Sequence, residues 1–572
     1  MRRLAWALLL VAVVGTSLSL HAQQQTADII LTNGKIITVN DTFQIAQAVA
    51  IKGARIIAVG SNADVQKFAG PGTNRIDLKG KSVVPGFIDN HAHFQEEGAY
   101  WTMELRFDGV DTRKKALEMI AAKAKATPNG GWVYNLGGWS PAQFSDDKRE
   151  FTREELDKVA PNNPVFLQFT RWAQYLNSKA IAQLGLDSMK DPWIERDASG
   201  KPTGITRVAG RNILFNKAGF LKTENGGKAD LPADVIERNQ KAMLRDFAIA
   251  GLTSSAGQCL WDDLYRKFER EGKPGMRFFC FKTVQAGGRG ADVFQRQLAE
   301  VANLRYHDGD EWMDNANYGE RFPGGGGGDV LTPGPEPIAS QEAWDQWGTF
   351  GLAVAKAGIP VMLHTVTAKA IEAQMDQVEK IAKQVDIRPL RWSFMHMEAV
   401  TPEIVERMKK LNMFLAINPR EQVSGGLLHQ IQGDKAFGMP PLREIQDSGI
   451  MWGLGTDAFE VNQYRPFQTL YWAVTGKMVG GTVVNTHTIS REAALIAHTR
   501  SNAYLLFREN DLGSIQPGRF ADLVVTDKDY LTVPAEQIKD IKSVLTVLGG
   551  KIVYDASKDP APDSITMVTS TK

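Results

Sequence analysis

The chain has 572 residues, of which 43% are hydrophobic and 23% charged, so it can bury a large core and does not have the composition of a disordered protein. Its 66 Lys and Arg residues balance 65 Asp and Glu residues, for a formal net charge of +1. This balance gives no electrostatic reason to expect nucleic-acid binding. The 2 cysteines, Cys259 and Cys280, exclude a disulfide-stapled scaffold and a cysteine-rich zinc site, and they either pair or stay as buried thiols.

The first 22 residues have the pattern of a secretory signal peptide. Arg2 and Arg3 give a positive start, an apolar run covers 4–14, and small and polar residues follow as far as Ala22. The apolar run is shorter than the ~20 residues needed to cross a bilayer, which favours cleavage after Ala22 over an uncleaved anchor. We therefore expect residues 1–22 to be removed and the mature protein to be periplasmic or secreted, with no membrane attachment.

Short β-prone segments near both ends of the chain predict one small β-sandwich. Residues 29–39 contain Asn33-Gly34 between two apolar runs, a pattern typical of a β-hairpin. Residues 544–554 contain Gly549-Gly550 in a similar setting and predict a second hairpin. Neither piece is large enough for its own sheet core. We therefore expect residues 23–84 and 506–572 to pack together, with the rest of the chain inserted between them.

The middle of the chain alternates short apolar runs with helical patterns. The apolar runs include residues 276–281, 359–363, 390–395, 413–417 and 450–454, and the helical stretches include 368–384 and 402–411. This alternation predicts an α/β fold of parallel β/α units over about residues 85–505. If the units close into a barrel, the functional residues should lie at the C-terminal ends of its strands.

Two segments interrupt the alternation. The segment of about residues 101–247 is too long for a single loop and predicts a subdomain inserted over the mouth of the barrel. Its Trp139, Trp172 and Trp193 either line an apolar substrate pocket or form the core of the insertion. The Gly/Pro-rich residues 322–337 lack the Gly-Lys-Ser/Thr ending of a phosphate loop and predict a flexible loop, with a mobile active-site lid as the alternative.

Histidines stand where the predicted strands end. His91 and His93 follow the apolar run 83–88, and residues two apart on a strand point the same way. His364, His396 and Asp457 each end a later apolar run. A single buried histidine needs no special explanation, but the chain has only 9. If the strands form a closed barrel, four imidazoles and a carboxylate meet at one mouth, which favours a metal site.

The chain resembles the amidohydrolase superfamily, and within it amidohydrolase family 3, which includes N-substituted formamide deformylases. The resemblance covers nearly all of the mature chain. It is carried by the approach to His91 and His93 (residues 85–93), by two motifs in the insertion (177–180 and 200–204) and by residues 511–523, which match the family's return to the sandwich. The last motif is highly specific to the superfamily.

The resemblance implies a (β/α)8 TIM-like barrel and hydrolysis of a non-peptide C–N bond by a metal-activated hydroxide. It also implies a site of one or two divalent metal ions. Carried over residue by residue, it makes His91, His93, His364 and His396 metal ligands. Asp457 would be both a ligand and the general base that takes the water's proton.

The chain also departs from the family pattern. The commonest family form has a lysine on the fourth strand, carbamylated to bridge two metals, but here the strand leads to Glu320 with no lysine. Glu320 either supplies a bridging carboxylate or is a surface glutamate. His364 is followed by Thr365-Val366 instead of Gly-Asp, Met395 stands where a glutamate is frequent, and Trp172 stands where a histidine is common. These changes bear on substrate specificity more than on the chemistry.

Imidazole and carboxylate ligands suit Zn, with Mn, Fe or Co as alternatives. We expect a small-molecule substrate, and a homo-oligomer is possible. A lactonase, esterase or deaminase could use the same metal site, and an exported binding protein could keep the fold without activity. A serine hydrolase is weakly indicated by residues 138–142, which nearly match a nucleophile elbow but lack its final glycine.

Overall fold

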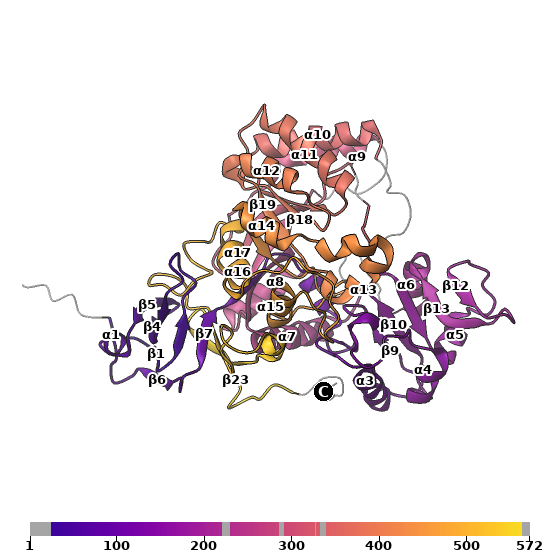
Figure 1. Cartoon of the computed structure of the whole chain (residues 1–572), viewed down its shortest axis with the longest axis horizontal. Helices are drawn as coiled ribbons and strands as arrows, with labels where there is room; N and C mark the ends of the chain where they lie inside the picture. The colour runs from indigo at the N-terminus through magenta and orange to yellow at the C-terminus, as the bar shows by residue number, and fades with distance from the viewer. Residues whose placement is uncertain (1–24, 220–228, 285–290, 326–327, 332–338, 563–572) are drawn as a thin grey trace, which may run out of the picture.

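The computed structural model describes residues 25–219, 229–284, 291–325, 328–331 and 339–562. The expected signal peptide at 1–22 lies outside the described residues, as do 326–327 and 332–338 of the Gly/Pro-rich stretch. Figure 1 shows the described chain as a central barrel with β1, β4, β5 and β6 at one side and the sheet of β9, β10, β12 and β13 at the other. Among the described residues, no helix has both the length and the apolar character needed to cross a membrane.

The centre of the molecule is an eight-stranded sheet in which every paired neighbour runs parallel. In sheet order its strands are β8 (Phe87–Asp89), β14 (Leu252–Gln258), β15 (Arg277–Lys282), β16 (Met313–Glu320), β17 (Val361–Thr365), β18 (Ser393–His396), β19 (Phe414–Ile417) and β20 (Trp452–Leu454). Helices between them include α7 (Ala233–Ala250), α8 (Asp262–Arg270), α9 (Ala291–Glu300), α10 (Gln341–Lys356), α11 (Ala368–Ala382), α12 (Pro402–Lys410) and α14 (Leu442–Ser448). The predicted α/β barrel is confirmed.

Helix α11 illustrates why these segments are helical and how they cover the barrel. Its N-cap is Thr367, whose hydroxyl accepts a hydrogen bond from the backbone N–H of Ala370. Ile371, Met375 and Val378 follow at spacings of three and four residues and are fully buried. This spacing places them on one face of the helix, which packs into the main hydrophobic core.

The first and last strands of the barrel are joined by side chains and loops. The amide of Asn502 donates hydrogen bonds to the carbonyl oxygens of Ile88 on β8 (2.7 Å) and Leu454 on β20 (2.6 Å). Its own oxygen accepts a hydrogen bond from the side chain of Asn90 (3.0 Å). Just beyond the strand ends, the Asp457 N–H donates to the carbonyl of His91 (2.7 Å). The barrel is thereby closed at its seam.

The two ends of the chain form a β-sandwich, as the sequence predicted. One sheet contains β1 (Ile29–Thr32), β4 (Ala48–Lys52), β5 (Arg55–Gly60) and β6 (Asn74–Asp77). The other joins β2 (Lys35–Ile37), β3 (Ile45–Ala46) and β7 (Ser82–Pro85) to β21 (Leu523–Thr526), β22 (Ser543–Leu548) and β23 (Lys551–Asp555). Both contribute to one apolar core that includes Leu31, Val83 and Val547.

The hairpin expected at Asn33-Gly34 is wrong, whereas the one at Gly549-Gly550 is confirmed. Strands β1 and β2 on either side of Asn33 belong to different sheets, so the turn crosses between the two layers. A Cβ on Gly34 would lie 2.3 Å from the side chain of Leu78 in the shared core. Apolar residues of both β1 and β2 are buried in the core between the two sheets, and this burial outweighs the local preference of Asn33-Gly34 for a hairpin. Strands β22 and β23 pair directly across their turn.

The insertion is built around a five-stranded sheet. Its strands are β9 (Val133–Asn135), β10 (Val165–Phe169), β11 (Ala173–Leu176), β12 (Ile194–Arg196) and β13 (Pro202–Arg207). Helices α3 (Arg113–Ala126), α4 (Arg153–Val159), α5 (Ser178–Leu184) and α6 (Arg211–Ala218) accompany it. Helix α7, which falls largely within the expected insertion boundaries, contacts α2 (Phe94–Gly98) and β14 of the barrel.

Candidate metal centre

The chemistry-bearing side chains come from five strands of the barrel. His91 and His93 follow β8, Glu320 is the last residue of β16, and the parallel register pairs Glu320 with Leu363, next to His364 on β17. The next register pairs Met395 with His364, so His396 follows at the end of β18. Asp457 lies three residues beyond β20. Because the strands are parallel, these positions meet at one mouth of the barrel.

The side-chain atoms approach one another closely enough to share ions. Asp457 Oδ1 is 3.2 Å from Nε2 of both His91 and His93. Glu320 Oε1 is 3.4 Å and 3.5 Å from the same two nitrogens. Asp457 Oδ2 is 3.7 Å from His396 Nδ1, and Glu320 Oε2 is 4.0 Å from His364 Nδ1.

Several ring nitrogens at this mouth are buried without a hydrogen bond. Both ring nitrogens of His91 and of His396, and Nδ1 of His364, make no hydrogen bond of acceptable geometry to any described residue. Buried polar atoms are ordinarily paired, and an unpaired one is costly. A divalent cation would satisfy them, and imidazole with carboxylate is a suitable donor set. The residues therefore fit a metal site.

Two overlapping ligand groups can be drawn in this cluster. The first contains His91, His396 and Asp457, and the second contains His91, His93 and Glu320. Within each group the donor atoms lie within 4.8 Å of one another. His364 adds an imidazole whose ring centroid is 4.4 Å from that of His396. The site accordingly offers room for one ion or for two neighbouring ions.

The charges around the site favour anionic carboxylates at Asp457 and Glu320 and neutral imidazoles at His364 and His396. Burial alone would raise the pKa of Asp457, but the facing rings of His396, His91 and His93 hold it well below its ordinary value. Burial, followed by the nearby guanidinium of Arg321, lowers the pKa of His364 to about 3. Burial also lowers the pKa of His396 well below its usual value. Burial also disfavours the charged form of His93, but the carboxylates of Asp457, Glu96 and Glu320 raise its pKa well above the ordinary value. Anionic carboxylates and neutral imidazoles are the protonation states that ligate metals, and a cation bound at His93 would have to displace its proton.

The carboxylate of Asp89 binds the backbone at His91 and next to Asp457, two of the candidate ligands. It accepts hydrogen bonds from the backbone N–H of His91 (3.1 Å) and from the N–H and hydroxyl of Thr456 (2.9 and 2.6 Å). Burial raises the pKa of Asp89 to about 6. The ring of Phe281 stacks on His91 at 5.5 Å with an interplanar angle of 8°. Asp89 thus holds the ends of β8 and β20 together, and Phe281 fixes the plane of one imidazole.

All six side chains predicted from the sequence (His91, His93, Glu320, His364, His396 and Asp457) lie at this mouth. Glu320 faces the histidines instead of the outer surface. The assignment of the six as metal ligands, and of Asp457 as the base, stays a prediction.

Sequence reasoning missed an ion cluster beside the site. The buried Arg420 donates to Glu398 (2.7 Å) and to Asp329 (3.0 Å). Its charge also lowers the pKa of His364 and His396, after the larger effect of burial. The available signal was position, because Arg420 comes three residues after β19 and Glu398 two residues after β18.

A second missed cluster joins the insertion to the barrel. Glu460, three residues after Asp457, accepts from Gln168 (2.8 Å) and Arg171 (2.8 Å) and also pairs with Arg211. A Cβ on Gly137 would lie 2.2 Å from the carbonyl oxygen of Glu460, so the backbone of the insertion packs directly on the loop that carries Asp457. Nothing in the local sequence pairs residues so far apart.

The structure also answers the questions that the sequence left open about three tryptophans, Ser140 and the two cysteines. Trp139 and Trp193 lie in the hydrophobic cores of the insertion, whereas Trp172 is half-buried. The side chain of Ser140 is fully buried and its hydroxyl donates to the carbonyl of Val423, so nothing exposes it as a nucleophile. Cys259 and Cys280 form a disulfide.

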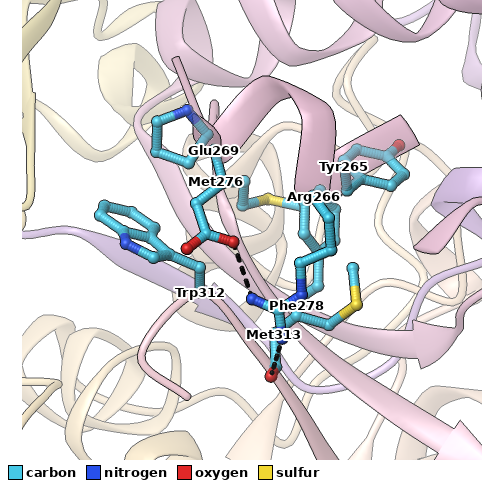
Figure 2. A pocket seen from close by; sticks show the side chains of 8 residues that line it. Tyr265, Arg266, Glu269, Met276, Phe278, Trp312 and Met313 are labelled. Atoms are coloured by element: carbon cyan, nitrogen blue, oxygen red, sulfur yellow. Dashed lines mark hydrogen bonds and ion pairs between the residues drawn. The ribbon is translucent and has the colours of Figure 1, made fainter. Parts of the chain in front are cut away.

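A small cavity also lies at the opposite end of the barrel strands, at the starts of β15 and β16. Figure 2 shows it lined by side chains that include Phe278, Trp312 and Arg266, with Arg266 bonded to Glu269 (2.7 Å). Its volume of about 10 Å³ is at most enough for one water. This cavity is therefore too small to hold a substrate.

A parallel β/α barrel with histidines and carboxylates gathered at its C-terminal mouth defines the class of barrel hydrolases that use bound metal. Comparison with known proteins agrees, since the model of the amidohydrolase family matches residues 75–554. The chain belongs to this family, and it is an amidohydrolase, a metal-dependent hydrolase acting on C–N bonds, as the sequence predicted.

Individual relatives are similar over almost their whole length. An N-substituted formamide deformylase of Arthrobacter pascens is 27% identical over 93% of this chain and 99% of the relative. An uncharacterized metal-dependent hydrolase of Pyrococcus furiosus has a TM-score of 0.59 at 21% identity, covering 88% of this chain and 100% of that structure. Atrazine chlorohydrolase TrzN of Arthrobacter aurescens, solved with zinc, has a TM-score of 0.53 at 17% identity, with 95% and 99% covered. These structural likenesses show a shared fold.

Proposed function

We propose that this protein hydrolyses an amide-type, non-peptide C–N bond of a small molecule at the cluster formed by His91, His93, His364, His396, Glu320 and Asp457. The observation that supports the proposal is the convergence of four imidazoles and two carboxylates, in which five buried ring nitrogens have no hydrogen bond to any described residue. A divalent cation there would act as a Lewis acid on the substrate carbonyl and lower the pKa of water to about 7.

The donor set supports zinc, with Mn, Fe or Co as alternatives, and the solved relative with zinc is consistent with that choice. The two ligand groups share His91, and one imidazole nitrogen binds one ion, so a second neighbouring ion would depend on the other histidines and on a shared carboxylate. Glu320 faces His91, His93 and His364, so its carboxylate would bridge two ions if two were bound, in the role that the family commonly gives to a modified lysine.

Asp457 is the general base in this proposal. Its carboxylate is anionic because the facing histidines hold its pKa low. It takes a proton from the attacking water and delivers it to the departing nitrogen, since an amine is a poor leaving group until protonated. The backbone N–H of Asp457 donates to His91 O (2.7 Å), and this bond fixes the carboxylate beside the imidazoles.

Access to the site is one-sided. The side chains of His91 and His396 are 1% exposed, whereas those of His93 and Glu320 are 23% and 25% exposed. The substrate therefore enters past His93 and Glu320, and little solvent reaches the side chains of His91 and His396. Exclusion of water from the inner side strengthens the electrostatic interactions there.

Two further features of the protein are part of the proposal. Similarity to the formamide deformylase over nearly its full length supports an N-acyl or N-formyl amine as substrate. A periplasmic or secreted location is supported by the signal-like residues 1–22 and by the disulfide between Cys259 and Cys280, because disulfides persist in oxidising compartments.

The test is elemental analysis of the purified protein combined with a panel of N-formyl amines, lactones and cyclic imides. We expect a divalent metal near stoichiometric amounts and amide hydrolysis that a chelator abolishes and zinc restores. Metal-bearing protein that turns over only lactones would shift the assignment to an esterase. Protein that holds no metal and hydrolyses none of the panel would refute the proposal.

A further inference from the structure

Arg321, at the mouth of the barrel, carries a guanidinium group that has no partner in the part of the chain that the structure describes. Arg321 directly follows Glu320 at the end of β16, and its side chain is exposed. Among the described residues, none makes a hydrogen bond or an ion pair with it. A permanently charged group left unpaired at the rim of an active site is available to a ligand.

The strand register places Arg321 beside the metal centre. Glu320 pairs with Leu363, so the next residue, Arg321, comes level with His364. Consecutive Cα atoms are about 3.8 Å apart, so the backbone of Arg321 stands next to the proposed bridging carboxylate. After burial, the charge of Arg321 is the largest influence that lowers the pKa of His364, which agrees with this placement.

The other arginines at the mouth are already neutralised or shared. Arg420 is held by both Glu398 and Asp329. Arg171 directs its Nε and one Nη to a single oxygen of Glu460, at 2.8 Å each. Arg321 differs because no described carboxylate lies within ion-pair distance of it, and several carboxylates at the mouth already have partners. Those carboxylates and their partners are Glu96 with His93, Glu398 and Asp329 with Arg420, and Glu460 with Arg171 and Arg211.

Sheet order sets where Arg321 stands relative to the proposed base. Strands β17, β18 and β19 separate β16 from β20 in one direction, and β15, β14 and β8 separate them in the other. Arg321 after β16 and Asp457 after β20 therefore face each other across the mouth. The chain positions of Asp457 and Arg321 thus lie on opposite sides of the proposed metal site.

We infer that Arg321 binds a carboxylate of the substrate, so the preferred substrates are anionic amides that carry a carboxylate group near the bond to be cleaved. This inference rests on the proposed hydrolysis at the same site. Guanidinium matches a carboxylate through two parallel N–H···O bonds. The neutral relatives of such amides lack the group that pairs with Arg321 and bind more weakly.

Two matched substrate pairs test this. N-formylphenylalanine and N-formylphenethylamine differ by a carboxylate on the amine side, and N-benzylsuccinamate and N-benzylpropanamide differ by one on the acyl side. With zinc-loaded protein we expect the anionic member of at least one pair to have the lower KM, by about tenfold or more. The pair that discriminates shows on which side of the amide the carboxylate lies.

The variant Arg321→Gln should remove most of this preference through KM, with a smaller change for the neutral member. Arg321→Lys should restore part of it, because the charge remains without the paired geometry. Arg270→Gln is the matched control, since Arg270 is exposed at the end of α8, at the opposite end of the barrel, and should behave as wild type.

Calorimetric titration of the same four compounds into metal-loaded Asp457→Asn protein gives a readout independent of turnover. Tighter binding of an anionic member, lost in the Arg321→Gln, Asp457→Asn double variant, supports the inference. Equal binding of both members in both pairs, or a preference that survives Arg321→Gln, overturns it. If neutral amides are hydrolysed without such a preference, the proposed function stands and this inference falls. Absence of any amide hydrolysis refutes the proposed function instead.

Discussion

The side chains at the barrel mouth divide into those proposed to bind metal, one proposed to transfer protons, and those that hold the backbone in place. His91 and His396 are buried proposed ligands whose ring nitrogens have no hydrogen-bond partner among the described residues. His93 and Glu320 are more exposed, and Asp457 lies beside two imidazoles. The backbone around them is held by Asp89 and Asn502, neither of which touches the proposed ion position in this geometry. Substitutions should therefore separate loss of metal from loss of proton transfer and from loss of stability.

Asp457→Asn keeps the shape of the side chain and removes its capacity to accept a proton. We expect kcat for amide hydrolysis to fall at least about 100-fold, the usual worth of a general acid–base group, while most of the metal stays bound by the histidines. Steady-state kinetics with elemental analysis measures both. The control is Asp447→Asn, on the exposed surface of α14. Wild-type kcat in Asp457→Asn would remove this residue from its role.

Glu320→Gln tests whether a carboxylate takes the place of the family's bridging lysine. A neutral amide is a weaker ligand than a carboxylate, so we expect the metal content to drop by about one ion per chain if two are bound. Inductively coupled plasma mass spectrometry after zinc loading and desalting gives the ratio. Unchanged metal content in Glu320→Gln would return Glu320 to the status of an ordinary surface glutamate.

Several contacts link the barrel strands next to the site. β8 and β20 are tied together by Asn502 and by the Asp457–His91 backbone bond, and β14 and β15 are tied by the disulfide. These cross-links lie at the same end of the barrel as the ligands. Order in this region therefore depends on contacts between segments that are distant in the chain.

Removal of the disulfide should cost stability without abolishing chemistry. Cys259 and Cys280 are 21 residues apart, and closing a loop of that size restricts the unfolded chain by about 3 kcal/mol. We expect the double variant Cys259→Ser, Cys280→Ser to lower the free energy of unfolding by about that amount in urea titrations. Identical midpoints for the variant and the oxidised wild type would show that the link adds nothing.

Asn502→Ala removes three hydrogen bonds at the barrel seam and leaves the carbonyls of Ile88 and Leu454 buried without this donor. An unsatisfied buried polar group costs about 1–3 kcal/mol, so we expect a loss of roughly 3 kcal/mol in the free energy of unfolding. Asn162→Ala, at an exposed loop position, should be neutral. An equal and small effect for both variants would contradict the role of Asn502 at the seam.

Periodicity and motif predicted the barrel, the sandwich and five of the six candidate site residues, because strand ends and His-x-His spacing are local features. Glu320 was suggested only by the resemblance to the family, with a surface glutamate as the alternative. The turn at Asn33-Gly34 was misjudged because its two strands are buried in different sheets. The clusters around Arg420 and Glu460 join residues up to about 290 positions apart, and no local pattern shows such pairing. The unpaired state of Arg321 likewise becomes visible only when its neighbours are placed.

At the scale of the whole molecule, the sandwich and the insertion pack against the barrel, which carries the candidate site at the C-terminal end of its strands. The sandwich completes the chain ends, the insertion packs its backbone on the loop carrying Asp457 through Gly137 and Glu460, and the barrel gathers the ligands. A metal bound only by the folded state must stabilise the whole fold. We therefore expect dialysis against a chelator to lower the melting temperature, and zinc to restore it. The same melting temperature with and without metal would mean that the ion does not bind at a site formed by the folded protein.

The most direct test of the account is the metal content of wild-type protein compared with the double variant His91→Ala, His396→Ala, both confirmed to be folded by circular dichroism and loaded with zinc under the same conditions. We predict at least about one tightly held ion in the wild type and near-complete loss in the variant, because His91 belongs to both ligand groups. Equal metal retention in the two proteins would contradict the claim that these strand-end histidines share a bound cation.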